Sequence, residues 1–326
     1  MISRRSLLTA AVAAAATGGL AACAKDGGGT NTGNGNGKIT LGFSQTGSES
    51  GWRTANTKSI QESATAAGID LKFSDAQGKE ENQIAAVRSF IQQKVDVISF
   101  SPLKVTGWDT VLKEAKAANI PVILTDRGVE ADASLYVSLL GSDFTEEGKR
   151  AAVMFKEICK DMAAVNIAQL EGSTGSAPAI ERTKGFAEAI ASETKFKIVV
   201  TQTGEFTRSK GKEVMEAFLK SHPEINALYA QNDDMGLGAI QAIEAAGKKP
   251  GTDIRIVTVD AIKDGMTALA AGKINGIVEC NPLLGPQLME MVKKVKAGQT
   301  VEKRIITIEK DFYQKDAAAA LPTRQY

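Results

Sequence analysis

The sequence predicts an α/β protein made of two similar lobes, each a doubly wound parallel sheet covered by helices. From residue 38 onward, strand-like runs alternate with helix-like runs. The strand-like runs are short, continuous and rich in Val and Ile, which is typical of strands buried on both faces of a parallel sheet. The alternation restarts after about five strands, and ten strands would be many for one twisted sheet, so two lobes are expected.

The elements follow in a regular order along the chain. In the first series, strand-like runs cover residues 38–44, 69–74, 95–100, 120–125 and 134–140, with helical patterns over 51–67, 80–93 and 107–118. In the second series, strand-like runs cover residues 165–170, 196–202, 227–230, 254–259 and 274–279, with helical patterns over 177–191, 208–220, 234–246 and 262–271. Glycines in AAGID and AAGKKPG end two of these helices as expected for C-terminal caps.

The end of the chain indicates that it returns to the first lobe. A helical pattern over 284–297 precedes the strand-like RIITIEKDF at 304–312. We therefore expect an N-terminal lobe of residues 38–141 plus 282–303, and a C-terminal lobe of residues 142–281 plus 304–326.

The N-terminus has the pattern of an export signal. MISRRSLLTAAVAAAATGGLAAC has two arginines, an apolar stretch too short for a confident membrane span, and small residues before Cys23. SRRSLL resembles a twin-arginine signal, although Leu7 replaces the usual Phe and leaves general secretion open. LAAC resembles a lipobox, so we expect a signal peptide at 1–22 and lipidation at Cys23. A flexible Gly/Asn linker is expected to follow up to residue 37. The alternative is a plain signal peptide in which the cysteine occurs by chance.

Composition excludes several classes of function. The net charge is +1 without a basic stripe, which disfavours nucleic acid as a partner. His222 is the single histidine, so a three-histidine metal site is impossible. The chain has no P-loop, no G-x-S-x-G and no metal-ligand cluster, and GLGAIQ lacks the third glycine of a dinucleotide fingerprint, so we expect no cofactor and no metal. Cys159 and Cys280 are expected to be free thiols.

Polar side chains recur where strands end, and in open parallel sheets ligands bind at the carboxyl ends of the strands. The residues at these places are Gln45, Glu49, Trp52 and Arg53 after the first strand, Asp126 and Arg127 after the fourth, and Phe206, Asn232, Asp260 and Glu279 in the second series. Carboxylates, amides and an arginine fork suit paired hydroxyls, and an aromatic face covers the C–H side of a sugar ring. The set predicts a cleft for a polyhydroxyl ligand.

Some of these residues have a simpler structural alternative. Glu49 and Arg53 stand at i, i+4 spacing, so a surface ion pair competes with ligand contact. Within QNDD at 231–234, we expect Asn232 to contact the ligand, Asp233 to cap the following helix, and Asp234 to face solvent or the hinge. Asp143 and Thr207 are expected to be helix caps.

The motifs IPVILTDR, GFAEAI, EFTRSKGKEVM, AQNDDMGLGAI and VTVDA resemble those of the periplasmic sugar-binding proteins of ABC importers, in the ribose-binding and repressor-like class. The resemblance covers nearly all of residues 38–310. GFSQTGSESGWRTANTKS, ENQIAAVRSFI and FTRSKGKEVM look most like the galactofuranose-binding members of that class.

The resemblance implies two lobes joined by a three-stranded hinge that close on a sugar. Asp126 and Arg127 would hold ring hydroxyls, Arg182 would donate from the second lobe, and Asn232 and Asp260 would complete that side. Phe206 and Trp52 would stack on the ring, and Glu279 would lie beside the hinge. The segment 45–53 lacks the paired aromatics of the ribose-binding pattern, so ribose is disfavoured.

We therefore expect an exported, lipid-anchored monomer that captures a monosaccharide, galactofuranose-like or a related aldose, and delivers it to an ABC permease and ATPase. A sensory sugar receptor of the same fold is the alternative. A glycoside hydrolase using two of Asp126, Asp233, Asp260 and Glu279 is remote. A DNA-binding repressor would need a helix-turn-helix before residue 38, where the export signal and linker stand.

Overall fold

A computed structural model describes residues 37–326 of the chain, and Lys38–Tyr326 form one compact unit. The predicted signal peptide at 1–22, the lipidation site at Cys23 and nearly all of the linker lie outside the described residues. Within the described residues, none of the helices is long and apolar enough to cross a membrane.

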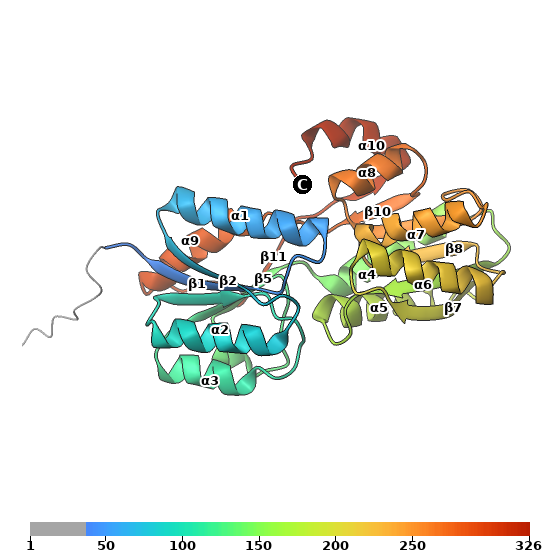
Figure 1. The fold of residues 1–326 in the computed structure, drawn as a ribbon. Helices are drawn as coiled ribbons and strands as arrows, with labels where there is room; N and C mark the ends of the chain where they lie inside the picture. Colours follow the sequence, from blue (N-terminus) through green and yellow to red (C-terminus); the bar gives the residue numbers. More distant parts are fainter. Residues whose placement is uncertain (1–36) are drawn as a thin grey trace, which may run out of the picture. The chain divides into compact units, whose positions relative to one another are not determined.

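The first sheet has six strands in the order β2-β1-β3-β4-β5-β11, all parallel (Figure 1). The strands are β1 (Thr40–Gln45), β2 (Asp70–Asp75), β3 (Val97–Phe100), β4 (Val122–Thr125), β5 (Ser138–Gly141) and β11 (Arg304–Ile306). Its helices are α1 (Gly51–Ala67), α2 (Glu80–Gln92), α3 (Asp109–Ala117), the short η1 (Ala133–Leu135) and α9 (Gly285–Lys296). Helix α1 packs beside α9, and α2 packs beside α3.

The second sheet repeats this arrangement in the order β7-β6-β8-β9-β10-β12, with only β12 antiparallel to its neighbour. The strands are β6 (Val165–Glu171), β7 (Phe196–Thr203), β8 (Ala227–Ala230), β9 (Arg255–Asp260), β10 (Gly276–Glu279) and β12 (Asp311–Tyr313). Its helices are α4 (Phe144–Ile158), α5 (Ala177–Ile190), α6 (Arg208–Ser221), α7 (Asp233–Ala245), α8 (Lys263–Ala270), α10 (Gln314–Ala320) and the short η2 (Leu321–Thr323).

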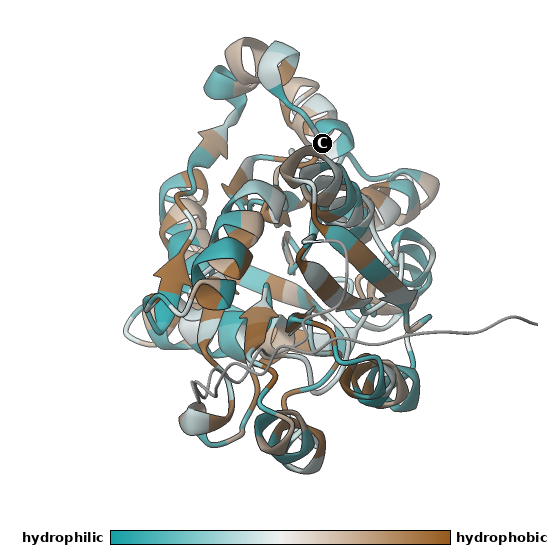
Figure 2. Ribbon diagram, turned by 90° about the vertical axis from the view of Figure 1, so that its left-hand side faces the viewer, coloured by the Kyte–Doolittle hydropathy of each residue, from teal (hydrophilic) through white to brown (hydrophobic). Residues whose placement is uncertain are grey.

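The apolar runs form strands because successive side chains enter two different cores. In β8, Ala227 and Tyr229 pack into the core under α4 and α5, whereas Leu228 and Ala230 pack into the core under α6 and α7. This two-residue alternation buries a strand on both faces. Figure 2 shows the result, with hydrophobic strands inside and hydrophilic helix faces outside. The predicted two-lobe fold is confirmed.

The chain passes between the sheets three times, after β5, after β10 and between β11 and β12. RIITIEKDF was expected as one strand, but it forms two: β11 joins the first sheet and β12 the second. The first sheet therefore extends to Ile306, beyond residue 303, where we expected the first lobe to end. The remaining lobe boundaries stay a prediction.

Candidate functional site

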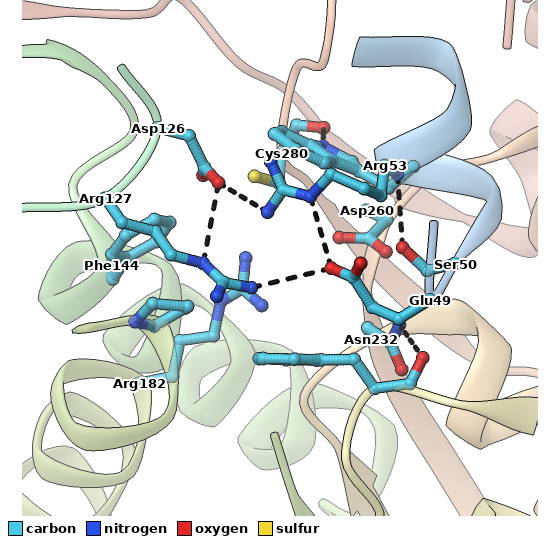
Figure 3. A pocket seen from close by; sticks show the side chains of 13 residues that line it. Glu49, Ser50, Arg53, Asp126, Arg127, Phe144, Arg182, Asn232, Asp260 and Cys280 are labelled. Atoms are coloured by element: carbon cyan, nitrogen blue, oxygen red, sulfur yellow. Dashed lines mark hydrogen bonds and ion pairs between the residues drawn. The ribbon is translucent and has the colours of Figure 1, made fainter. Parts of the chain in front are cut away.

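A pocket of about 290 Å³ lies between the two sheets, at the carboxyl ends of their strands. From the first lobe it is lined by Glu49, Ser50, Trp52, Arg53, Asp126 and Arg127, and from the second lobe and the hinge by Phe144, Pro178, Arg182, Phe206, Asn232, Asp260 and Cys280 (Figure 3). Nine of the eleven ligand-binding residues expected from the sequence line this pocket. These nine come from six separate segments of the chain, which only the fold brings together.

The first-lobe side is a network of charges around Arg53. Its Nη2 donates to Asp126 Oδ2 at 2.7 Å and its Nε donates to Glu49 Oε1 at 3.1 Å. Ser101 Oγ also donates to Asp126 Oδ2, at 2.9 Å. Burial alone would raise the pKa of Asp126, but the charges of Arg53 and Arg127 outweigh it and lower that pKa. Asp126 is thus an ionised acceptor, and the Glu49–Arg53 pair forms inside the pocket wall, because Arg53 is only 2% exposed.

Arg127 differs from Arg53 because its hydrogen-bonding capacity is unused. It is buried, yet its Nε and Nη1 have no hydrogen-bond partner among residues 37–326. Its nearest carboxylates are Asp126, 3.6 Å from Nε, and Glu49, 3.7 Å from Nη2, both beyond hydrogen-bonding distance. Burial first, and then the neighbouring charge of Arg53, lowers the pKa of Arg127 to about 10, so it still carries a charge at neutral pH.

The second-lobe side holds Arg182 and Asp260. Arg182 Nε donates to the buried carboxylate of Glu147 at 2.7 Å, and its Nη1 donates to the Gln231 carbonyl at 2.6 Å. Asp260 Oδ2 is buried, and no described residue forms a hydrogen bond with it. Burial raises the pKa of Asp260 well above its usual range, so its carboxyl can carry a proton and both donate and accept.

Three aromatic rings line the pocket, each facing an arginine. The guanidinium carbons of Arg53, Arg127 and Arg182 lie 4.7, 5.4 and 5.1 Å from the ring centres of Trp52, Phe206 and Phe144 respectively. These are cation–π distances. The Trp52 indole is fixed by a 2.7 Å hydrogen bond to the Cys280 carbonyl. Gly172 makes room for Phe206, since a Cβ there would lie 1.8 Å from the Phe206 ring.

The backbone at this pocket is unusual. Asp126, Phe206 and Asp260 have φ of 62°, 60° and 121°, in the left-handed half of φ space. Non-glycine residues in such conformations cost about 1–3 kcal/mol each and gather at functional sites.

Two expected site residues lie elsewhere. Gln45 Nε2 donates to Asn56 Oδ1 and Thr57 Oγ1 of α1, so its amide holds the helix against the sheet instead of facing the pocket. Glu279 accepts hydrogen bonds from Arg324, from the Tyr326 hydroxyl and from the backbone of Lys310, all beyond the pocket wall. Glu279 is at the hinge, as expected, and is not among the residues that line the pocket.

The QNDD segment is arranged differently from the prediction. Asn232 lines the pocket and is itself the N-cap of α7, because its Oδ1 accepts from Met235 N at 2.9 Å. Asp233, expected as the cap, is buried and accepts from Thr258 Oγ1 and Ile262 N. Asp234, expected to face solvent or the hinge, instead crosses to the other lobe, where its Oδ2 accepts from Gly51 N at 2.7 Å. The expected caps Asp143 and Thr207 are confirmed.

Sequence reading missed Phe144, Ser50, Pro178 and Cys280 as pocket residues. Phe144 was detectable, since Asp143 follows the fifth strand and Phe144 opens the next helix. Cys159 and Cys280 are both buried and unpaired, as predicted.

One further group of side chains has ligand atoms within 4.8 Å of one another, namely Glu147, Cys280 and Glu309. Glu147 is already paired with Arg182, and Glu309 lies 3.5 Å from Arg150 and accepts from Thr307 and Asn281. Most of these carboxylate oxygens already have partners within the protein, whereas Glu147 Oε1 is buried without one among the described residues.

Residues 41–300 of the chain match the model of a known protein family, the periplasmic binding protein domain. The chain belongs to this family. It is 45% identical over 285 residues to the galactofuranose-binding protein YtfQ of Escherichia coli K12, covering 86% of this chain and 89% of that protein.

Two solved structures are also similar to the chain. A Mycobacterium smegmatis protein in complex with β-D-fucofuranose is 61% identical, with a TM-score of 0.86 over 88% of this chain and 95% of that one. The binding protein of the arabinose ABC transporter of Shewanella sp. ANA-3, bound to α- and β-L-arabinofuranose, is 47% identical, with a TM-score of 0.85 over 88% and 96%. The Escherichia coli and Shewanella relatives are named as binding proteins, which supports the expectation that the chain is not an enzyme.

Proposed function

We propose that this protein captures a monosaccharide in its furanose form between the two lobes and delivers it to the permease of an ABC importer. The observation that carries the proposal is the pair of buried, unpartnered groups on opposite walls of one pocket. Arg127 offers two free nitrogens from the first lobe, and Asp260 offers a free carboxyl oxygen from the second. A buried polar group without a partner costs about 1–3 kcal/mol, and a bound polyol would remove that cost on both walls.

The remaining pocket residues have complementary roles in this proposal. Asp126 accepts from ring hydroxyls because Arg53 keeps it ionised, and Arg182 and Asn232 donate from the second lobe. Phe206, Phe144 and Trp52 cover the apolar faces of the ring. Glu49 closes the pocket beside Arg127. The furanose form is supported by the relatives, whose names and bound ligands include galactofuranose, fucofuranose and arabinofuranose.

We also propose export, lipidation at Cys23 and action as a monomer held at the outer face of the membrane by the linker. The family supports an extracytoplasmic location. Mass spectrometry of the mature protein and of Cys23→Ser, with membrane fractionation, tests the anchor. An unmodified cysteine or an unchanged fraction on the membrane would contradict it.

Binding is tested by thermal shift and calorimetry against galactose, arabinose, fucose, fructose, ribose, xylose, glucose and myo-inositol. A ligand at about 100 times its Kd stabilises the protein by about 2.7 kcal/mol. NMR of the released sugar, or a crystal structure, identifies the ring form. A bound pyranose would refute the furanose assignment, and the absence of any hit would refute a monosaccharide ligand from this panel.

Two variants connect a hit to the pocket. Arg127→Ala is expected to weaken binding at least tenfold, whereas Arg88→Ala, an exposed arginine paired with Glu114, is expected to leave it unchanged. Equal effects of the two substitutions would remove Arg127 from the site.

A further inference from the structure

A second, larger cavity adjoins the pocket at the opening between the lobes. We call it the vestibule and define it by Gly47, Ser48, Asp75 and Lys104 of the first lobe and Thr174 and Glu205 of the second, among others. Its empty volume is about 1310 Å³ including solvent at the mouth, against about 290 Å³ for the pocket. The vestibule therefore has room for a second sugar ring, next to a first ring that fills the pocket.

The two cavities are adjacent. Glu49 and Arg127 line both of them, and they are the only residues shared by the two linings described. Their closest approach, 3.7 Å between Glu49 Oε1 and Arg127 Nη2, is too long for a hydrogen bond. Arg127 also keeps two unpartnered nitrogens while being 97% buried. The Glu49–Arg127 pair between the two cavities is thus not hydrogen-bonded, and Arg127 has donors free to bind a glycosidic oxygen.

The chemistry of the vestibule suits a neutral polyol. Its walls offer hydroxyls, amides and charges of both signs, with Asp75 and Glu205 facing the cavity as well as Lys104. This balance has no excess of positive charge to attract a phosphate. Gln77 and Glu205, one from each lobe, have left-handed backbones with φ of 54° and 53°, the same feature that marks the pocket.

We propose that the vestibule is a second sugar subsite, so that the protein also binds disaccharides with a furanose residue in the pocket and the attached sugar in the vestibule. This inference rests on the proposed function, because the furanose residue occupies the same pocket. It extends the ligand class from free monosaccharides to short furanosyl oligosaccharides. No bond is made or broken in binding.

The test compares monosaccharide and disaccharide binding in matched variants. Thr174 is exposed on the second-lobe wall and Ser48 is exposed on the first, and neither side chain has a described hydrogen bond within residues 37–326. Thr174→Trp and Ser48→Trp fill the vestibule from opposite sides, and Thr174→Ser is the conservative control. The probes are arabinofuranosyl and galactofuranosyl disaccharides in each available linkage, measured by calorimetry beside the parent monosaccharides.

We expect the unmodified protein to bind at least one disaccharide within about tenfold of its monosaccharide Kd. Each Trp variant is expected to weaken that disaccharide by at least about tenfold and to change the monosaccharide Kd by less than about threefold. Thr174→Ser should change neither.

The outcomes separate the two proposals. Monosaccharide binding with no disaccharide binding overturns the subsite and leaves the proposed function intact. Equal weakening of both ligands by the Trp variants also overturns it, because the substitutions would then act on lobe closure. Binding of neither ligand overturns the proposed function and the subsite with it.

Discussion

Asp234 is predicted to stabilise the closed arrangement of the lobes without touching the ligand. Its Oδ2 accepts from the backbone N–H of Gly51, the first residue of α1 in the opposite lobe, at 2.7 Å. Its Oδ1 accepts from Arg208 Nε at 3.0 Å within its own lobe. Opening the lobes would break the contact with Gly51 and keep the contact with Arg208. The first contact therefore contributes only to the closed, ligand-bound state.

The expected loss of closure free energy in Asp234→Ala follows from two interactions of the carboxylate with the N-terminus of α1 at Gly51. A hydrogen bond to a charged group contributes about 1.5–3 kcal/mol. A carboxylate at a helix N-terminus contributes about 0.3–1 kcal/mol. The Arg208 charge already offsets part of the carboxylate charge, so we take the lower end and expect Asp234→Ala to lose about 2 kcal/mol of closure free energy. Since 1.4 kcal/mol is tenfold, Kd should rise about thirtyfold. Asp234→Asn keeps a neutral acceptor, and its Kd should rise about fivefold.

The assay is calorimetry on these variants with the preferred sugar, beside Asp264→Ala. Asp264 is a matched control because it also pairs with Arg208, at 2.9 Å, but is 63% exposed. The order of preference among sugars should not change in any variant, because Asp234 does not line the pocket. A Kd for Asp234→Ala within about twofold of the unmodified protein, or an equal rise for Asp264→Ala, would refute the reasoning.

Three further predictions concern the pocket and the core beside it. Arg127→Ala should reduce sugar affinity by about 1.5–3 kcal/mol. The melting temperature without ligand should stay unchanged or rise, because the substitution removes a buried guanidinium with unpartnered nitrogens. A lower melting temperature without ligand would contradict this. Gly172→Ala should abolish tight binding and destabilise the fold by about 1–3 kcal/mol, since its Cβ would lie 1.8 Å from the Phe206 ring; calorimetry and denaturant unfolding measure both effects, and wild-type values in either would show that the ring moves freely. Burial raises the pKa of Asp233 from 3.8 to about 7. The protonated carboxyl therefore stabilises the folded state fully below about pH 4, and this contribution to the free energy of unfolding is lost as the pH rises through about 7. The melting temperature should therefore fall between about pH 4 and about pH 7, and the fall should be smaller in Asp233→Asn; an equal fall would assign the pH dependence to other groups.

Most of the fold could be predicted because the sequence patterns that indicate strands and helix ends are local. Short Val/Ile runs followed by polar residues indicate strands that are buried on both faces. Gly68 ends α1 with φ of 70°, as its place in AAGID predicts. The division of RIITIEKDF into β11 and β12 could not be predicted, because each half pairs with a different sheet. Nothing local in the nine residues marks the crossing between them.

The site was predictable to the level of strand ends, and less so to the level of side chains. Asp126 and Arg127 reach the pocket because they directly follow β4, and Asp260 reaches it because it is the last residue of β9. Gln45 occupies an equivalent position, but neighbouring hydroxyl and amide groups on α1 bind its amide. Asn232 and Asp233 are both good caps, and which of them caps depends on Thr258 and Ile262, residues of a later strand and loop that hold Asp233 away.

The last residues of the chain have a practical consequence for handling the protein. The Tyr326 hydroxyl and Arg324 donate to Glu279 at 2.9 and 2.6 Å, and the Tyr326 carbonyl oxygen accepts from Lys263 N at the start of α8 at 2.7 Å. A purification tag fused after Tyr326 would add chain beside the contact with Lys263 and would disturb the residues that hold Glu279 at the hinge. Affinities measured on C-terminally tagged protein would then report the tag as well as the sugar, and a cleavable tag upstream of Lys38 avoids this.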